Sequence, residues 1–234
     1  MRIAALALLA SLVAGPALAQ CKPTDRNCIE VDLRLLSAGF GYGAGRITDL
    51  ASGTPNRAMM GLNLRLDVFI LSRIKGLPFA TYDALFTDMT WGKRTGDPLR
   101  FGTLDEDNSA MPFVIGYHFV AGLRRNGVAV MGGLGYQHFD HDIGGTLMSG
   151  SATPITGRVE VGENGRLVAM AWVAPGSKGM MAARVDLHVF RNLNLMASYW
   201  QAKGIAQPWD QPTGTEVSAT ASMFVVGFRT AELR

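Results

Sequence analysis

Four side chains that could bind a metal ion lie close together near the middle of the chain. They are His138, Asp140, His141 and Asp142. Imidazole and carboxylate groups are zinc ligands, and carboxylates combined with loop carbonyls are calcium ligands. Strand alternation puts His141 on one side of the chain and the other three on the opposite side. Because no distant fourth ligand is evident, the segment is interpreted as a solvated strand end, and no metal or other cofactor is predicted.

A second group of charged and polar residues alternates with apolar residues along expected strands. The group comprises Arg34, Arg65, Asp67, Arg184, Asp186 and His188, together with His118 and Asp83 at mid-strand positions. In a narrow β-barrel these side chains would all lie inside, where side chains fill the lumen. Burial requires the charges to be paired, since an unpaired one costs several kcal/mol. We therefore predict a lumen filled by ion pairs and hydrogen bonds, with a gated ion or proton path as the alternative.

The strands that position these residues are predicted from the alternation of apolar and polar side chains. They are expected near residues 31–35, 62–70, 79–91, 111–123, 128–137, 183–189, 193–200 and 215–229. Short turns alternate with long polar loops between them. This rhythm is typical of an antiparallel, up-and-down transmembrane β-barrel.

Residues 155–173 decide how many strands the barrel has. They read as a hairpin around Asn164-Gly165. Its first arm, Ile155 to Val161, is shorter than the ~9–11 residues that a membrane-crossing strand needs. The sequence therefore predicts eight strands, with ten as the alternative if the hairpin crosses the membrane.

The first residues of the chain predict export. Residues 1–19 have a basic start, an apolar stretch and an Ala17-Leu18-Ala19 cleavage site, as in a secretory signal peptide. Residues 20–29 form a short periplasmic segment, in which a Cys21–Cys28 disulfide is expected because the periplasm is oxidising. Residues 30–234 form the barrel domain. No later stretch has the ~18 consecutive apolar residues of a membrane helix.

Composition supports this class of protein. Hydrophobic residues make up 48% of the chain and charged residues only 18%, below the ~25% usual for soluble domains. A barrel with lipid on one face accounts for this balance. The net charge of +3 is spread without a Lys/Arg run, so no nucleic-acid partner is expected.

The pattern of strands over roughly residues 30–230 resembles the small outer-membrane barrels of the OmpA/OmpX, opacity-like type. Phe224-Val-Val-Gly-Phe228-Arg229 is similar to the family's last strand, although this chain continues to Arg234 where the family usually ends on an aromatic residue. The resemblance implies a place in the bacterial outer membrane. It also implies contact with lipid and lipopolysaccharide and insertion by the barrel-assembly machinery.

The function expected from these features is non-enzymatic, either structural in the envelope or a surface interaction through the outer loops. One alternative is an acyl hydrolase or transferase acting on lipid A, which would need a serine, a histidine and an acid within ~3 Å at the membrane rim. The candidates are Ser149 or Ser151 with His138 or His141. The other alternative is a soluble periplasmic β-protein. Five aromatic residues near strand ends are expected to form an interfacial girdle: Tyr42, Trp91, Tyr136, Tyr199 and Trp200.

Overall fold

A computed structural model describes residues 29–48, 57–74, 77–94, 109–110, 113–142, 146–162, 166–175, 179–191, 193–208 and 217–230. The signal segment, Cys21 and Cys28 lie outside these residues. The strands are β1 (Ile29–Thr48), β2 (Arg57–Ile74), β3 (Phe79–Arg94), β4 (Ser109–Ala110), β5 (Phe113–Arg125), β6 (Val128–Asp142), β7 (Thr146–Ala152), β8 (Ile155–Val161), β9 (Leu167–Ala174), β10 (Met180–Phe190), β11 (Leu193–Pro208) and β12 (Val217–Thr230). Within the described residues, no helix is long and apolar enough to cross a membrane.

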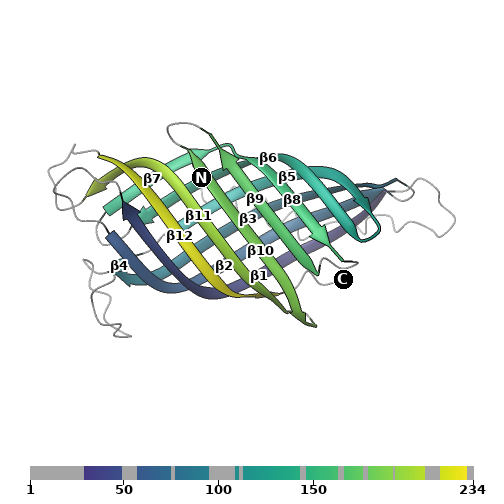
Figure 1. Ribbon diagram of the computed structural model, residues 1–234, viewed down its shortest axis with the longest axis horizontal. Helices are drawn as coiled ribbons and strands as arrows, with labels where there is room; N and C mark the ends of the chain where they lie inside the picture. The colour runs from purple at the N-terminus through teal and green to yellow at the C-terminus, as the bar shows by residue number, and fades with distance from the viewer. Residues whose placement is uncertain are drawn as a thin grey trace, which may run out of the picture.

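The strands close into an antiparallel barrel (Figure 1). The ring runs β10-β9-β8-β6-β5-β3-β2-β1-β12-β11 and closes because β11 pairs with β10. It therefore contains ten strands, so the predicted count of eight is wrong and the alternative of ten holds. The short strands β4 and β7 lie towards the left-hand end of the barrel in Figure 1, which we call the β7 end.

The predicted strand count is too low because the arm Ile155–Val161, which looked too short to cross a membrane, is extended by the strand that precedes it. β8 and β7 both pair with β6, on either side of a break at Thr153-Pro154. Together they run the full length of β6. The segment 146–152 is rich in Gly, Ser and Thr, and sequence reasoning assigned it to a loop for that reason.

The set of strands that forms the barrel wall also changes along the barrel axis. The hairpin of β9 and β10 stops before it reaches the β7 end. At that point the Lys203 amide donates a hydrogen bond to the Gly179 carbonyl at 2.8 Å. Beyond this point β7 pairs directly with β11, from Ser149↔Ile205 to Thr146↔Pro208. The barrel thus has ten strands over most of its length and eight at the β7 end.

Side chains alternate between the lumen and the outer surface along most of each strand, with register shifts at Arg34/Ser37 in β1 and His188/Phe190 in β10. On β2, Asn63, Arg65, Asp67 and Phe69 are buried inside, whereas the intervening Leu62 to Ile70 positions face out. The turn between β5 and β6, opposite the β7 end, is tight. Asn126 and Gly127 adopt φ of 50° and 76°, the left-handed values that a two-residue type I′ hairpin requires. These features were predicted from alternation and turn residues.

Candidate functional site

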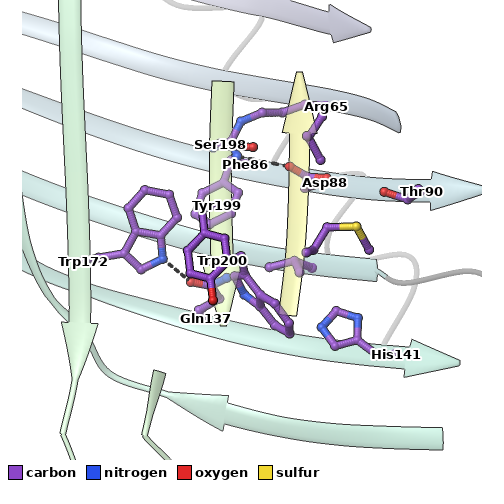
Figure 2. A pocket seen from close by; sticks show the side chains of 13 residues that line it. Arg65, Phe86, Asp88, Thr90, Gln137, His141, Trp172, Ser198, Tyr199 and Trp200 are labelled. Atoms are coloured by element: carbon purple, nitrogen blue, oxygen red, sulfur yellow. Dashed lines mark hydrogen bonds and ion pairs between the residues drawn. The ribbon is translucent and has the colours of Figure 1, made fainter. Parts of the chain in front are cut away.

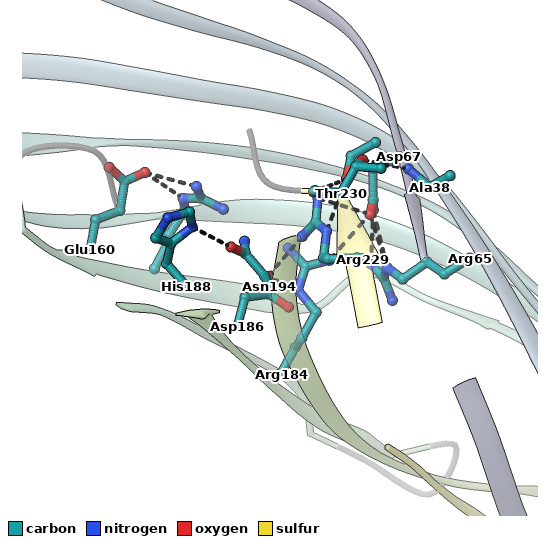
Figure 3. A network of polar contacts seen from close by, with 12 residues as sticks. Ala38, Arg65, Asp67, Glu160, Arg184, Asp186, His188, Asn194, Arg229 and Thr230 are labelled. Atoms are coloured by element: carbon teal, nitrogen blue, oxygen red, sulfur yellow. Dashed lines mark hydrogen bonds and ion pairs between the residues drawn. The ribbon is translucent and has the colours of Figure 1, made fainter. Parts of the chain in front are cut away.

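A network of five charged side chains crosses the middle of the lumen (Figure 3). Asp67 lies 3.0 Å from Arg65 Nη2, 3.5 Å from Arg184 Nη1 and 3.3 Å from Arg229 Nη2. Asp186 lies 3.1 Å from Arg184 Nε and 2.7 Å from Arg229 Nη1. Each of the five residues is at most 3% exposed. We call this set the central network.

The central network brings together residues from three strands that are distant in sequence. Arg65 and Asp67 come from β2, Arg184 and Asp186 from β10, and Arg229 from β12. Ser37 on β1 accepts a hydrogen bond from Arg229 Nε at 3.0 Å. Arg65 also reaches Asp88 on β3 at 3.3 Å and lies over the Phe86 ring. Such close pairing offsets part of the desolvation cost of the buried charges.

A second ionic cluster lies nearer the turns. Glu160 on β8 accepts hydrogen bonds from Arg158 Nε and from Arg124 Nη1, both at 2.8 Å. The Arg158 guanidinium lies 3.8 Å from the centre of the Tyr82 ring. His188 Nδ1 and Asn194 Oδ1 are 3.1 Å apart in the same part of the lumen, where Figure 3 shows their contact. These contacts fill the lumen from the turns to the central network.

Aromatic side chains occupy the lumen between the central network and the β7 end. The His118 ring stacks on Phe86 at 4.9 Å, and Trp172 Nε1 donates to Gln137 Oε1 at 2.7 Å. A cavity of about 30 Å³ remains beside Gln137, Trp200 and His141 (Figure 2). This volume holds about two water molecules.

The structure places most of the predicted lumen residues together. The central network contains four of them, Arg65, Asp67, Arg184 and Asp186. His118 lies on the side of the network towards the β7 end, and His188 lies on the side towards the turns. Arg34 lies in β1, but its side chain is outside the described part of the structure.

Two placements inferred from the sequence are wrong. Asp83 faces outward on β3 and accepts a hydrogen bond from the Tyr117 hydroxyl, because the inward face of that strand is taken by Ala80, Tyr82, Ala84 and Phe86. Trp200 also departs from the expected girdle, since it packs inside against His141 at 4.1 Å. The other four girdle aromatics face outward.

Sequence reasoning missed several members of the lumen clusters. Arg229, Arg158, Glu160 and Asp88 were not in the predicted set. For Arg229 the signal was present, because Phe224, Val226 and Phe228 face out on β12 and the alternation sends Arg229 inside. For Arg158 and Glu160 the signal was the Arg-Val-Glu-Val alternation of a hairpin whose place in the barrel was left undecided.

A different constellation lies on the outer surface near the β7 end. His138 Nδ1 is 2.9 Å from Ser151 Oγ, and His138 Nε2 is 3.5 Å from Asp140 Oδ2. The Tyr136 hydroxyl donates to Ser151 Oγ at 3.1 Å. We call these four residues the rim cluster. They meet because β6 and β7 pair in a register that sets His138 opposite Ser151.

The barrel wall separates residues that the sequence analysis considered as possible metal ligands before favouring a solvated strand end. His141 is buried inside the barrel, and His138 and Asp140 are outside. Among the residues that the structure describes, no group of three His, Cys, Asp or Glu side chains could hold a metal ion. The geometry at His138 is instead that of a serine, an imidazole and a carboxylate in a row.

Comparisons with known proteins give only distant similarities. No protein-family model and no curated protein matches the chain. Among solved structures it is similar to Ail, the attachment invasion locus protein of Yersinia pestis, at 16% identity over 83% of this chain and 97% of that chain, with a TM-score of 0.30. Neisserial surface protein A has 14% identity, 84% and 96% coverage and a TM-score of 0.36. The outer membrane protease OmpT from Escherichia coli has 12% identity, 92% and 99% coverage and a TM-score of 0.33. Because TM-scores this low do not establish a shared fold, the closed antiparallel barrel rests on the strand pairing of this chain, which agrees with the small-barrel resemblance of its sequence.

Proposed function

We propose that the protein spans the bacterial outer membrane as a closed-lumen β-barrel and acts through its outer surface, in envelope structure or surface interaction. The observation that carries this proposal is the apolar outer surface of the barrel. Among the described residues, fifteen polar or charged side chains, including the whole central network, are buried inside together with apolar ones. The exposed large side chains include Phe40, Leu62, Leu134, Val173 and Phe228. A soluble monomer rarely exposes a continuous apolar surface of this extent.

The height of the outer apolar surface supports the membrane placement. On β5 the outward positions from Phe113 to Leu123 are Phe, Ile, Tyr, Phe, Ala and Leu. Ten residue steps of about 3.3 Å, tilted by about 40°, rise about 25 Å, which matches the apolar band of outer-membrane barrels. We call this outward apolar zone the belt.

The filled lumen argues against a role as a diffusion pore. Water-filled porins have about sixteen or more strands, whereas this ring has ten. Its interior is occupied by two ionic clusters and an aromatic layer. The surfaces left for function are therefore the belt, its rim and the segments beyond the β7 end.

Fractionation of bacterial membranes tests this proposal. We expect the protein in the outer-membrane fraction, and a faster-migrating gel band before heating than after, because folded barrels resist detergent until heated. In planar bilayers we expect no large steady conductance. Protein that stays soluble without detergent would contradict the membrane placement, and a large stable conductance would contradict the closed lumen.

The partners expected of such a barrel remain part of the proposal. Lipopolysaccharide and phospholipid would cover the belt, and the barrel-assembly machinery would read the end of β12. Depleting that machinery should remove the protein from the outer membrane. Accumulation at normal levels after depletion would argue against this route of insertion.

A further inference from the structure

The hydrogen bonds of the rim cluster run in the direction that would activate a serine as a nucleophile. The Tyr136 hydroxyl donates to Ser151 Oγ, so the Ser151 proton is available to His138 Nδ1, 2.9 Å away. Asp140 lies beside the other ring nitrogen, at 3.5 Å from Nε2. A carboxylate there favours the tautomer that carries its proton on Nε2 and leaves Nδ1 free to accept.

The pairing of two strands holds this geometry. His138 and Asp140 alternate on the outward face of β6, and Ser151 faces out from β7. The register pairs His138 with Ser151 and Asp140 with Ser149. A site on paired strands is better fixed than one on a loop. The half-exposed side chains of His138 and Asp140 remain open to a substrate from outside, at 38% and 51% exposure.

The position of the rim cluster indicates the class of substrate. Leu134 and Ile155, which pair within the belt, face outward at 60% and 64% exposure. His138 and Ser151 lie four residues further towards the β7 end, where His138 pairs with Ile115, one outward position from the end of the belt at Phe113. Lys203 faces outward on β11 where the β9–β10 hairpin ends. The edge of the belt is where the ester carbonyls of membrane lipids lie, between acyl chains and charged headgroups. An ester placed there would meet Ser151, and Lys203 would offer a cation to a phosphate.

We propose that the rim cluster is a serine hydrolase site that cleaves carboxylic esters of lipids in the outer leaflet. The inference rests on the membrane placement proposed above and adds an activity to it. Ser151 is the nucleophile, His138 the general base and then acid, and Tyr136 a donor to the oxyanion. Asp140 is a positioning residue that orients His138. The proposal takes up the alternative that the sequence left open, and it selects Ser151 over Ser149 and His138 over His141.

The reaction proceeds in two balanced steps. Ser151 Oγ attacks the ester carbonyl while its proton passes to His138 Nδ1, and a tetrahedral oxyanion forms within reach of the Tyr136 hydroxyl. Collapse breaks the C–O bond, His138 returns the proton to the leaving alcohol, and an acyl-serine remains. Water, deprotonated by His138, then attacks this ester. The products are the alcohol, the free fatty acid and the regenerated Ser151.

The experiment uses the full mature chain in vesicles and measures fatty acid release by mass spectrometry. One arm contains phosphatidylethanolamine and phosphatidylglycerol alone, and the other adds lipopolysaccharide. Release in the first arm identifies phospholipid as a source, and release of acyl chains from lipid A in the second identifies lipopolysaccharide. Ser151→Ala should lower the rate about 10³-fold or more in the active arm. Tyr136→Phe should lower it about 10²–10³-fold, as for loss of one oxyanion donor.

The controls separate chemistry from folding. Ser149→Ala changes a serine on the same strand and face and should keep the wild-type rate. A fluorophosphonate probe should label the wild type and Ser149→Ala but not Ser151→Ala. For Asp140→Asn we expect lower kcat with KM unchanged and an altered pH profile, which a purely structural role would not produce.

The outcomes also distinguish this inference from the proposed function. Folded, vesicle-inserted protein that releases no fatty acid in either arm and is not labelled would overturn the hydrolase site and leave the barrel proposal intact. Equal rates for the wild type and Ser151→Ala would overturn it as well. A chain that does not enter vesicles would contradict both.

Discussion

Arg229 Nη1 donates a hydrogen bond to Asp186 Oδ2 at 2.7 Å, although their strands, β12 and β10, are separated in the ring by β11. The contact therefore passes over the inner face of β11. Arg229 also pairs with Asp67 on β2, and Asp67 pairs with Arg65 and Arg184. Because three arginines share two aspartates, no single carboxylate can be removed without leaving a buried cation underpaired.

Two Asp→Asn substitutions should separate the inside of the barrel from the outside. Asp67→Asn removes a carboxylate that is 1% exposed and lies within ion-pair distance of three arginines. We expect the free energy of unfolding to fall by about 3–5 kcal/mol. Urea-induced unfolding in detergent or vesicles, followed by tryptophan fluorescence, measures the change.

The matched control is Asp83→Asn. Asp83 faces outward and contacts the Tyr117 hydroxyl. Its replacement removes a charge from the outer surface and should leave stability unchanged or raised. If both variants lost similar free energy of unfolding, the buried central network would contribute no more to stability than an outward-facing carboxylate.

The lipid-facing side can be tested with one arginine at two heights. Leu134 is outward, 60% exposed and paired with Phe119 and Ile155 within the belt. Leu134→Arg should cost about 2–4 kcal/mol, as for a cation deep in a bilayer. Ser218→Arg places the same charge outward on β12, near the β7 end and beyond the belt, and should insert normally. Heat-dependent gel migration reports folding of both, and equal insertion would argue against lipid at Leu134.

Two strand glycines should respond oppositely to an added methyl group. A Cβ at Gly116 would lie 2.6 Å from two atoms of the Phe86 ring, whereas a Cβ at Gly157 meets nothing within 4 Å. Gly116→Ala should destabilise by about 1–3 kcal/mol through overpacking. Gly157→Ala should be neutral or stabilising by up to about 1 kcal/mol. Thermal unfolding of the pair tests how tightly the lumen is packed, and a mild Gly116→Ala would indicate a looser interior.

The disulfide remains a prediction from the sequence, because Cys21 and Cys28 lie outside the described residues. Intact-mass measurement of mature, unreduced protein should give a mass about 2 Da below that of the reduced form, since the bond removes two hydrogens. Free thiols in protein exported by oxidation-competent cells would exclude the bond.

Alternation alone predicted the barrel and the direction of many side chains, because neighbouring strand residues must face opposite sides. It failed on β3, where Tyr82 and Phe86 face the lumen and lie beneath the guanidinium groups of Arg158 and Arg65. Both faces of that strand carry apolar residues, with Leu85 and Trp91 outward, so polarity alone assigned Asp83 to the wrong side. A sequence pattern cannot reveal that an arginine on another strand will cover an aromatic ring.

The rim cluster could not be predicted because it depends on the register between β6 and β7, which local sequence does not determine. Ser151 meets His138 because β7 continues β8 across the Thr153-Pro154 break and stays paired with β6. Sequence reasoning named both residues as candidates, yet it assigned 146–152 to a loop, and a loop has no register. Eight strands were preferred over the alternative of ten partly because the segment 146–152 was assigned to a loop.

Solvent accessibility along β10 tests the central claim, that the outer face of this barrel meets lipid and its lumen is closed. Spin labels placed one at a time from Met181 to Val189 in vesicles would be probed with oxygen, which enters lipid, and with a water-soluble nickel complex. We predict high oxygen and low nickel accessibility at the outward positions 181, 183, 185, 187 and 189. Low accessibility to both is predicted at the buried positions 182, 184 and 186. High nickel accessibility at the outward positions would show that water covers the face assigned to lipid. High nickel accessibility at the buried positions would show that the lumen is a water-filled channel.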